Sequence, residues 1–147
     1  MLNSLKKVVL SVGCALALAS TAFAQETAAA ANTVPKLNIV WDCGKCEVNE
    51  KVIPLIEDFY RAEAAKRGLT VSDTETVDAK IHDFRQRPPG VRVMAGIMAG
   101  KDRLGLTLNY KSEEIVVKDY SANAMQGMNA LCESVAKQAV GILADKK

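Results

Sequence analysis

Cys43 and Cys46, separated by Gly44 and Lys45, are the residues of this 147-residue chain whose types and spacing best suit chemistry. Two thiols at this spacing can close a small reducible disulfide, and Lys45 is a cation that would stabilise an attacking thiolate. In such an exchange we expect Cys43 to be the nucleophile and Cys46 the resolving thiol, because the first cysteine is usually the more exposed one. These two thiols are the candidate catalytic residues.

A structural staple is the alternative interpretation of the same cysteines. Cys43 and Cys46 would then stay permanently oxidised, or one of them would bond to Cys132 and tie distant parts of the chain together. A bridge to Cys132 would close a loop of about 90 residues and stabilise the fold by roughly 4 kcal/mol in the loop-entropy model. The residues alone leave the redox pair and the staple open.

Sulfur side chains also raise the question of a soft-metal site, because thiols and thioethers suit Cu(I). The thioethers in question are those of Met94, Met98, Met125 and Met128. Met125, Met128 and Cys132 would share one face of an expected helix, but that face is apolar and core packing explains it without a metal. The single histidine, His82, offers no second imidazole. We therefore expect no metal and no cofactor.

A cationic segment surrounds a glycine-rich apolar stretch and supplies the candidate binding residues. These are Arg85, Arg87, Arg92, Met94 and Met98. As an exposed loop, the segment would present its methionines to a partner or to lipid, while the arginines grip carboxylates or phosphates. The alternative is a buried strand over residues 91–98, which its β-branched residues favour. We expect the strand, and the exposed loop is the second interpretation.

Composition and the other polar residues point away from further catalytic classes. Carboxylate pairs such as Glu57 and Asp58 look like solvated faces, and no serine lies in a nucleophile elbow. A single histidine makes Ser/His or Cys/His catalysis hard to assemble. The hydrophobic content of 49% argues against disorder, and the aromatic content of 5% leaves little for stacking on bases.

Residues 1–24 are typical of a cleaved secretory signal peptide. A basic start, a short apolar run and small residues at Ala22 and Ala24 predict cleavage after Ala24. The run is interrupted by serine and threonine, so it falls short of the roughly 20 apolar residues of a membrane-spanning helix. Lipid attachment at Cys14 is disfavoured, because the usual leucine is missing before it. We expect a periplasmic protein that does not span the membrane, in a compartment where disulfides persist.

Net charge narrows the range of partners. The chain has 19 basic and 17 acidic side chains, a formal charge of +2. Loss of residues 1–24 removes Lys6 and Lys7 and no acid, which leaves 17 of each sign and a net charge of zero. A neutral chain has no global field that would attract nucleic acid or anionic lipid. We therefore expect no nucleic-acid partner.

Hydrophobic periodicity predicts one α/β domain over residues 37–147, after a flexible leader at 25–36. The first half should contain a strand at 37–41, a helix that bends at Pro54 or has Pro54 in its first turn, and strand-like residues from Leu69 to His82. The second half should contain a hairpin of residues 104–110 and 114–118 and a helix capped by Ser121 or Asn123. This order predicts an α/β (α+β) two-layer sandwich, a mixed sheet of about four to five strands with two helices on one face.

The segment Trp41-Asp42-Cys43-Gly44-Lys45-Cys46 resembles the active site of the thioredoxin family, over about a dozen residues. That resemblance implies thiol–disulfide exchange by Cys43 and Cys46. The layout of the whole chain, with its signal peptide and the Arg-Pro-Pro-Gly sequence at 87–90, is similar to small exported bacterial envelope proteins, including the amino-terminal domain of the Tol–Pal propeller protein. This second resemblance implies a non-catalytic binding or scaffolding module, whose partner is another envelope protein or a small ligand.

Overall fold

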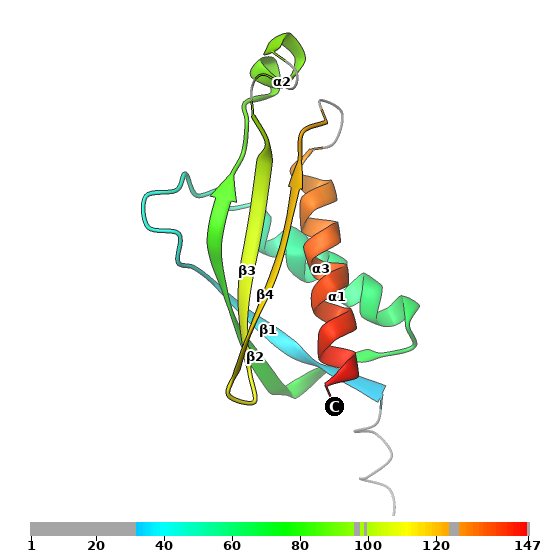
Figure 1. Cartoon of the computed structure of the whole chain (residues 1–147). Coiled ribbons are helices and arrows are strands. Elements are labelled where there is room, and N and C mark those ends of the chain that lie inside the picture. The colour runs from blue at the N-terminus through cyan, green and yellow to red at the C-terminus, as the bar shows by residue number, and fades with distance from the viewer. Residues whose placement is uncertain (1–31, 96–97, 99, 124–126, 147) are drawn as a thin grey trace, which may run out of the picture.

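Four strands and three helices make up the fold in the computed structural model, which describes residues 32–95, 98, 100–123 and 127–146 (Figure 1). In chain order the elements are β1 (Thr33–Trp41), α1 (Val52–Lys66), β2 (Thr70–Arg85), α2 (Pro89–Ala95), β3 (Asp102–Tyr110), β4 (Glu113–Ser121) and α3 (Met128–Asp145). The strands form one sheet in the order β1-β2-β3-β4. β1 runs parallel to β2 and the other pairs are antiparallel, so the sheet is mixed, as the sequence predicts.

α1 and α3 pack against each other on one face of the sheet (Figure 1). α1 buries one residue per turn, and these residues are Val52, Ile56, Tyr60 and Ala64. Alternate residues of β3 enter the same core because successive side chains of a strand point to opposite faces; they are Leu104, Leu106, Leu108 and Tyr110. The predicted two-layer sandwich with two helices on one face is confirmed. No helix in the described ranges combines the length and apolar character that crossing a membrane requires.

The hairpin of β3 and β4 confirms the clearest prediction from the sequence. Tyr110 pairs with Glu113, so the loop contains only Lys111 and Ser112. Both loop residues have positive φ, 50° and 65° respectively. Two-residue hairpin loops need this left-handed backbone to match the twist of the strands, and they usually use Asn or Gly to reach it. This hairpin therefore reaches its geometry with two residues that are not suited to it.

β1 begins at Thr33, so the prediction of a flexible leader is wrong for residues 33–36. Pro35 lies inside the strand, which an edge strand tolerates because a missing N–H on the outer side breaks no ladder bond. The pairing with β2 shifts register around it, between Val34 and Lys36. The buried hydroxyl of Tyr60 donates a hydrogen bond of 2.8 Å to the Pro35 carbonyl. The predicted signal peptide and residues 25–31 lie outside the described residues.

β2 is a single long strand with a bulge near its end. Val77, Ala79 and Ile81 alternate into the core, and Phe84 continues the buried set three residues later. The register with β3 shifts between Ile81 and Asp83, which adds the extra residue and returns the next apolar side chain to the core. The strand predicted from residue 69 onward is thus confirmed.

The starts of the two long helices settle two open points. α1 begins at Val52 with Pro54 in its first turn, where a missing N–H costs no helix bond. α3 begins at Met128, so the predicted caps at Ser121 and Asn123 are wrong. Ser121 is instead the last residue of β4.

The strand predicted over residues 91–98 is also wrong, because residues 89–95 form the short helix α2. Pro89 takes the first helical position, which its fixed φ suits. Val91 and Val93 are 43% and 79% exposed, so neither joins the core. The described side chains of this segment are exposed, as in the second interpretation, but residues 89–95 form a helix and not a loop.

Replacing Ser112 by glycine tests the strain in the β3–β4 turn. A non-glycine residue costs about 1 kcal/mol in the left-handed region. We expect Ser112→Gly to raise the free energy of unfolding in urea by about 0.5–1 kcal/mol. Ser134→Gly inside α3 is the matched control and should lower it by about 0.5–1 kcal/mol. A loss of stability in both variants would contradict strain in the turn.

Candidate functional site

The chemically distinctive residues gather at the end of the sheet where β1 and β2 finish. Because these two strands are parallel, the loop of residues 42–51 after β1 and the connection of residues 86–101 after β2 leave the sheet at the same end. α2 lies beyond the ends of β2 and β3 (Figure 1). Crevices outside the carboxyl ends of strands in open α/β sheets are common binding sites.

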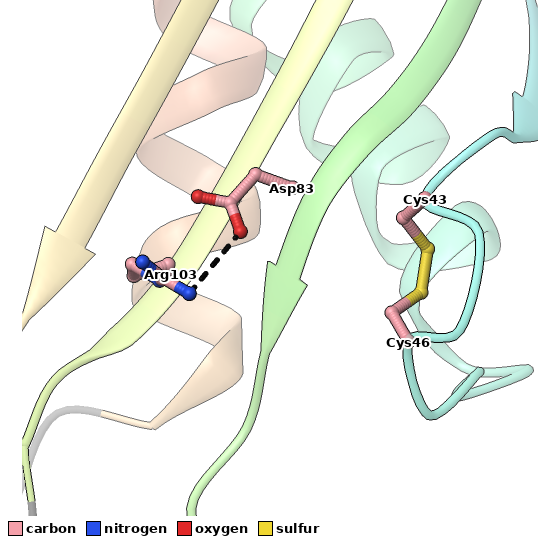
Figure 2. Close-up of a disulfide and its surroundings, with 4 residues drawn as sticks. All are labelled: Cys43, Cys46, Asp83 and Arg103. Carbon is pink, nitrogen blue, oxygen red and sulfur yellow. Dashed lines mark ion pairs between the residues drawn. A yellow bond between two sulfur atoms is a disulfide. The ribbon is translucent and has the colours of Figure 1, made fainter.

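Cys43 and Cys46 are joined in a disulfide, with their Cα atoms 5.6 Å apart (Figure 2). Gly44 has a φ of 63°, which allows the chain to turn between the two cysteines, and the N–H of Cys46 donates to the Cys43 carbonyl at 3.3 Å. Both cysteines are half-buried and pack against the core beside Trp41. The predicted bridge between Cys43 and Cys46 is confirmed.

The disulfide does not lie at the start of a helix. α1 begins at Val52, six residues after Cys46, and the residues between them form a loop. The thioredoxin resemblance implies a first cysteine at a helix N-terminus, where the helix dipole stabilises the thiolate. The charged neighbours of the two cysteines in the sequence are Lys45 and Glu47, which are both exposed, and Asp42, which forms an ion pair of 3.1 Å with Lys80. The dipole contribution is missing from this site.

Cys132 lies elsewhere, fully buried on α3, and it is the free cysteine of the described residues. The alternative bridge from Cys43 or Cys46 to Cys132 is therefore wrong. Burial raises the pKa of Cys132 to about 12, because the core disfavours a thiolate. The thiol is neutral at any physiological pH and acts as a small apolar side chain of the core.

No three His, Cys, Asp or Glu side chains come together as a metal site in the described parts of the chain. His82 lies on the open face of the sheet, where Thr107 Oγ1 is 2.9 Å from its Nδ1. Its ring lies over Gly105, and a Cβ there would come within 2.8 Å of Nε2. Met128 is buried at the start of α3, whereas Met125 lies outside the described residues.

A groove of about 590 Å³ separates the loop after β1 from the end of β2. One wall consists of residues 47–51 and the other of residues 84–89. The side chain of Asn49 donates a hydrogen bond of 2.7 Å to Gln86 Oε1, which joins the two walls. Glu47 and Glu50 contribute acids to the first wall, and Arg85 contributes a cation to the second.

The predicted binding residues fall into four groups, of which Arg87 alone forms the last. Arg85 is exposed and lines the groove, and its guanidinium lies beside Gly100, where a Cβ would come within 3.4 Å. Met94 and Met98 are 91% and 93% exposed, far from the core. The backbone of Arg92 belongs to α2, and its side chain lies outside the described set.

Arg87 has a different position, since its side chain is only 2% exposed. Its Nε and Nη2 donate to the two carboxylate oxygens of Asp102 at 3.2 and 3.3 Å, and its backbone N–H donates to Asp102 Oδ1 at 2.6 Å. The other donors reach the carbonyls of Gly100, Ser121 and Asn123 at 2.8, 3.2 and 3.4 Å. Arg87 therefore braces the fold in this structure and does not face a partner.

Sequence reasoning missed four contributors to this site. Asp102 had one usable signal, because it is the first acid after the cationic residues 85–101. Asn49 and Gln86 had none, because a hydrogen bond between two loops leaves no periodic pattern. Phe84 packs edge-to-face against Trp41, with ring centroids 5.1 Å apart, and secures the end of β2 beside the disulfide.

The brace predicts a large difference between two neighbouring arginines. Arg87→Met leaves the Asp102 carboxylate buried without its cation, so we expect the free energy of unfolding to fall by about 3–5 kcal/mol in urea or thermal titrations. Arg85→Met, the matched control at the surface, should change it by less than about 0.5 kcal/mol.

A second variant covers the case in which Arg87→Met does not fold. Adding Asp102→Asn removes the uncompensated charge but keeps an oxygen that accepts the backbone N–H of residue 87. This double variant should be more stable than Arg87→Met alone. Equal stability of the Arg87→Met and Arg85→Met proteins would contradict the brace.

Comparisons with known proteins do not assign a family. No protein-family model matches the chain, and a search of curated proteins finds no match. Among solved structures, the chain is similar to a PelC dodecamer from Paraburkholderia phytofirmans, with 13% sequence identity and a TM-score of 0.44, over 78% of this chain and 86% of that one. At this TM-score the likeness establishes neither a common fold nor a common function.

Proposed function

We propose that this protein is a small, non-catalytic binding module of the bacterial periplasm, in which the Cys43–Cys46 disulfide staples one wall of a binding groove. The observation that carries the proposal is the position of the disulfide. It closes a turn packed on the core directly before residues 47–51, which form one groove wall, and it lies away from any helix N-terminus.

The loop of residues 42–51 has no regular secondary structure, so separate contacts must hold its shape. The N–H of Asp42 donates to the Ile81 carbonyl at 2.9 Å, and Asn49 bonds to Gln86 at 2.7 Å. The disulfide lies between these two points of attachment. A loop fixed before binding loses less conformational entropy when a ligand arrives, which favours affinity.

The lining of the groove suggests the class of partner. A volume of about 590 Å³ lies within the usual range for small-molecule sites. Glu47 and Glu50 face a wall that contains Arg85, and Val48, Phe84 and the prolines add apolar surface. Such a groove suits a ligand or a peptide segment with charges of both signs and an apolar part. The partner would be another envelope protein or a small ligand.

Location outside the cytoplasm is part of the proposal, and two features support it. Residues 1–24 have the three-part pattern of a secretory signal, ending at Ala24. A disulfide that serves as a staple also needs an oxidising compartment.

Thiol–disulfide exchange is the second candidate function. The half-buried position of Cys43 and Cys46 and the exposed Lys45 between them favour it, because a reactive disulfide needs access and a nearby cation. In that case an external dithiol first reduces the bridge and is itself oxidised. The Cys43 thiolate then attacks the substrate disulfide and expels one substrate thiolate, and Cys46 resolves the mixed disulfide, which releases the second substrate thiol and re-forms the bridge.

The paired variant Cys43→Ser with Cys46→Ser separates the staple from the redox protein. Closing a four-residue loop stabilises by about 2 kcal/mol in the loop-entropy model, so we expect the free energy of unfolding to fall by about that amount with the fold retained. We also expect the wild-type protein to reduce insulin with dithiothreitol no faster than this variant does. Insulin reduction that depends on Cys43 would contradict the non-catalytic proposal.

The groove itself is tested by placing a photo-reactive amino acid at Glu50, on the groove wall, in cells that express the protein. We expect a discrete cross-linked product, and we expect the product to weaken when the two cysteines are replaced by serine. The same amino acid at Glu114, exposed on the sheet, is the matched control and should give no product. Equal products from both positions, or none from Glu50, would contradict a binding groove.

A further inference from the structure

Four apolar side chains are exposed to solvent in the connection between β2 and β3. Val91, Val93, Met94 and Met98, here named the apolar tip, are 43%, 79%, 91% and 93% exposed. Figure 1 shows α2 beyond the ends of β2 and β3, away from α1 and α3. Scattered apolar residues on a surface are ordinary, but large apolar side chains gathered at one protruding point mark an interaction site.

The surroundings of the apolar tip are cationic. Between Arg85 and Lys101 the sequence contains two further arginines and no acid. Arg85 and Lys101 are both exposed. The next acid in the sequence, Asp102, is fully buried and paired with Arg87. Arg103 forms an ion pair of 3.6 Å with Asp83 across β2 and β3 (Figure 2). The ion pairs of the described residues on β2 and β3 therefore leave Arg85 and Lys101 without a carboxylate partner, and the acids Glu47 and Glu50 face Arg85 only across the groove.

An aromatic residue completes the arrangement at the base of the apolar tip. The Lys101 ammonium lies 4.1 Å from the centroid of the Tyr120 ring. Tyr120 is 61% exposed and is the second-last residue of β4. A tyrosine with one apolar and one polar end, next to a lysine, is the combination found at the level of lipid headgroups.

We propose that the apolar tip docks this protein on an anionic membrane surface, with Val93, Met94 and Met98 at the acyl boundary and Arg85 and Lys101 at the lipid phosphates. The neutral net charge of the expected mature chain gives no long-range attraction, so docking depends on these local groups. The proposal goes beyond the groove and does not require it.

The size of the apolar tip favours lipid over a protein partner. A stable protein interface buries about 800 Å² on each side, with a shape matched to the partner. A helix of seven residues offers few side chains for an interface of that size. Binding to a membrane instead grows with the apolar area inserted and the cations nearby, and it needs no matching shape.

Vesicle flotation tests the proposal with the protein carrying the same N-terminus in every variant, so that any contribution of the first residues cancels. We expect binding to vesicles of equal phosphatidylcholine and phosphatidylglycerol, weak binding to phosphatidylcholine alone, and release by high salt. Val93→Ser, Met94→Gln and Met98→Gln together should weaken binding by at least about tenfold. Arg85→Gln with Lys101→Gln should weaken it by about fivefold for each cation.

The matched control replaces two exposed valines of the open sheet face, Val40→Ser and Val116→Ser, which are 45% and 51% exposed in the native protein. This control should bind vesicles as the wild type does. Equal loss in the control and the tip variant, or equal binding to neutral and anionic vesicles, would overturn the proposal. Tip-dependent binding to polyglutamate but not to vesicles would overturn it in favour of an acidic protein partner, and tip-dependent self-association without vesicle binding would overturn it in favour of a second copy.

Discussion

The ion pair between Arg87 and Asp102 is the interaction on which the functional end of the molecule depends. Two charges withdrawn from water cost several kcal/mol per ion, and their attraction offsets this only when the remaining donors are also bonded. Here two guanidinium nitrogens donate to the carboxylate. The remaining N–H groups donate to main-chain carbonyls, including those of Gly100 and Ser121. The two ends of the 86–101 connection and the end of β4 therefore meet at one side chain. Because Arg87 holds both ends of the 86–101 connection together, α2 can extend away from the sheet although its valines do not pack in the core.

Periodic parts of the fold were predictable because each depends on contacts that repeat along the chain. The alternation of leucines in β3 identified a hairpin, and the four-residue spacing after Val52 identified α1. The bridge between Cys43 and Cys46 was predictable for a related reason, since cysteines three residues apart need only a turn to meet. In all three cases the residues that decide the structure are neighbours in sequence.

The failures came from contacts that join distant residues. Pro35 suggested a leader, yet an edge position and the hydroxyl of Tyr60, 25 residues away, keep it in β1. The valines of α2 suggested a strand, because β-branched residues favour strands when a neighbouring strand is available to pair with. Arg87 suggested a partner, since nothing local in the sequence shows that Asp102 lies within hydrogen-bond distance. Sequence patterns report which residues are apolar or charged, whereas tertiary packing decides which of them are used inside the fold.

The groove and the apolar tip share their boundary, and this links the two proposals physically. Pro88 and Pro89 line the groove, and Pro89 is also the first residue of α2. Arg85 lines the groove while its guanidinium lies beside Gly100, where the connection returns to β3. A lipid phosphate drawn to Arg85 would therefore alter the charge that the groove offers to its ligand, and a bound carboxylate would compete for the same guanidinium. Docking on an anionic surface and binding in the groove should consequently be coupled through Arg85, with a sign set by the charge of the ligand.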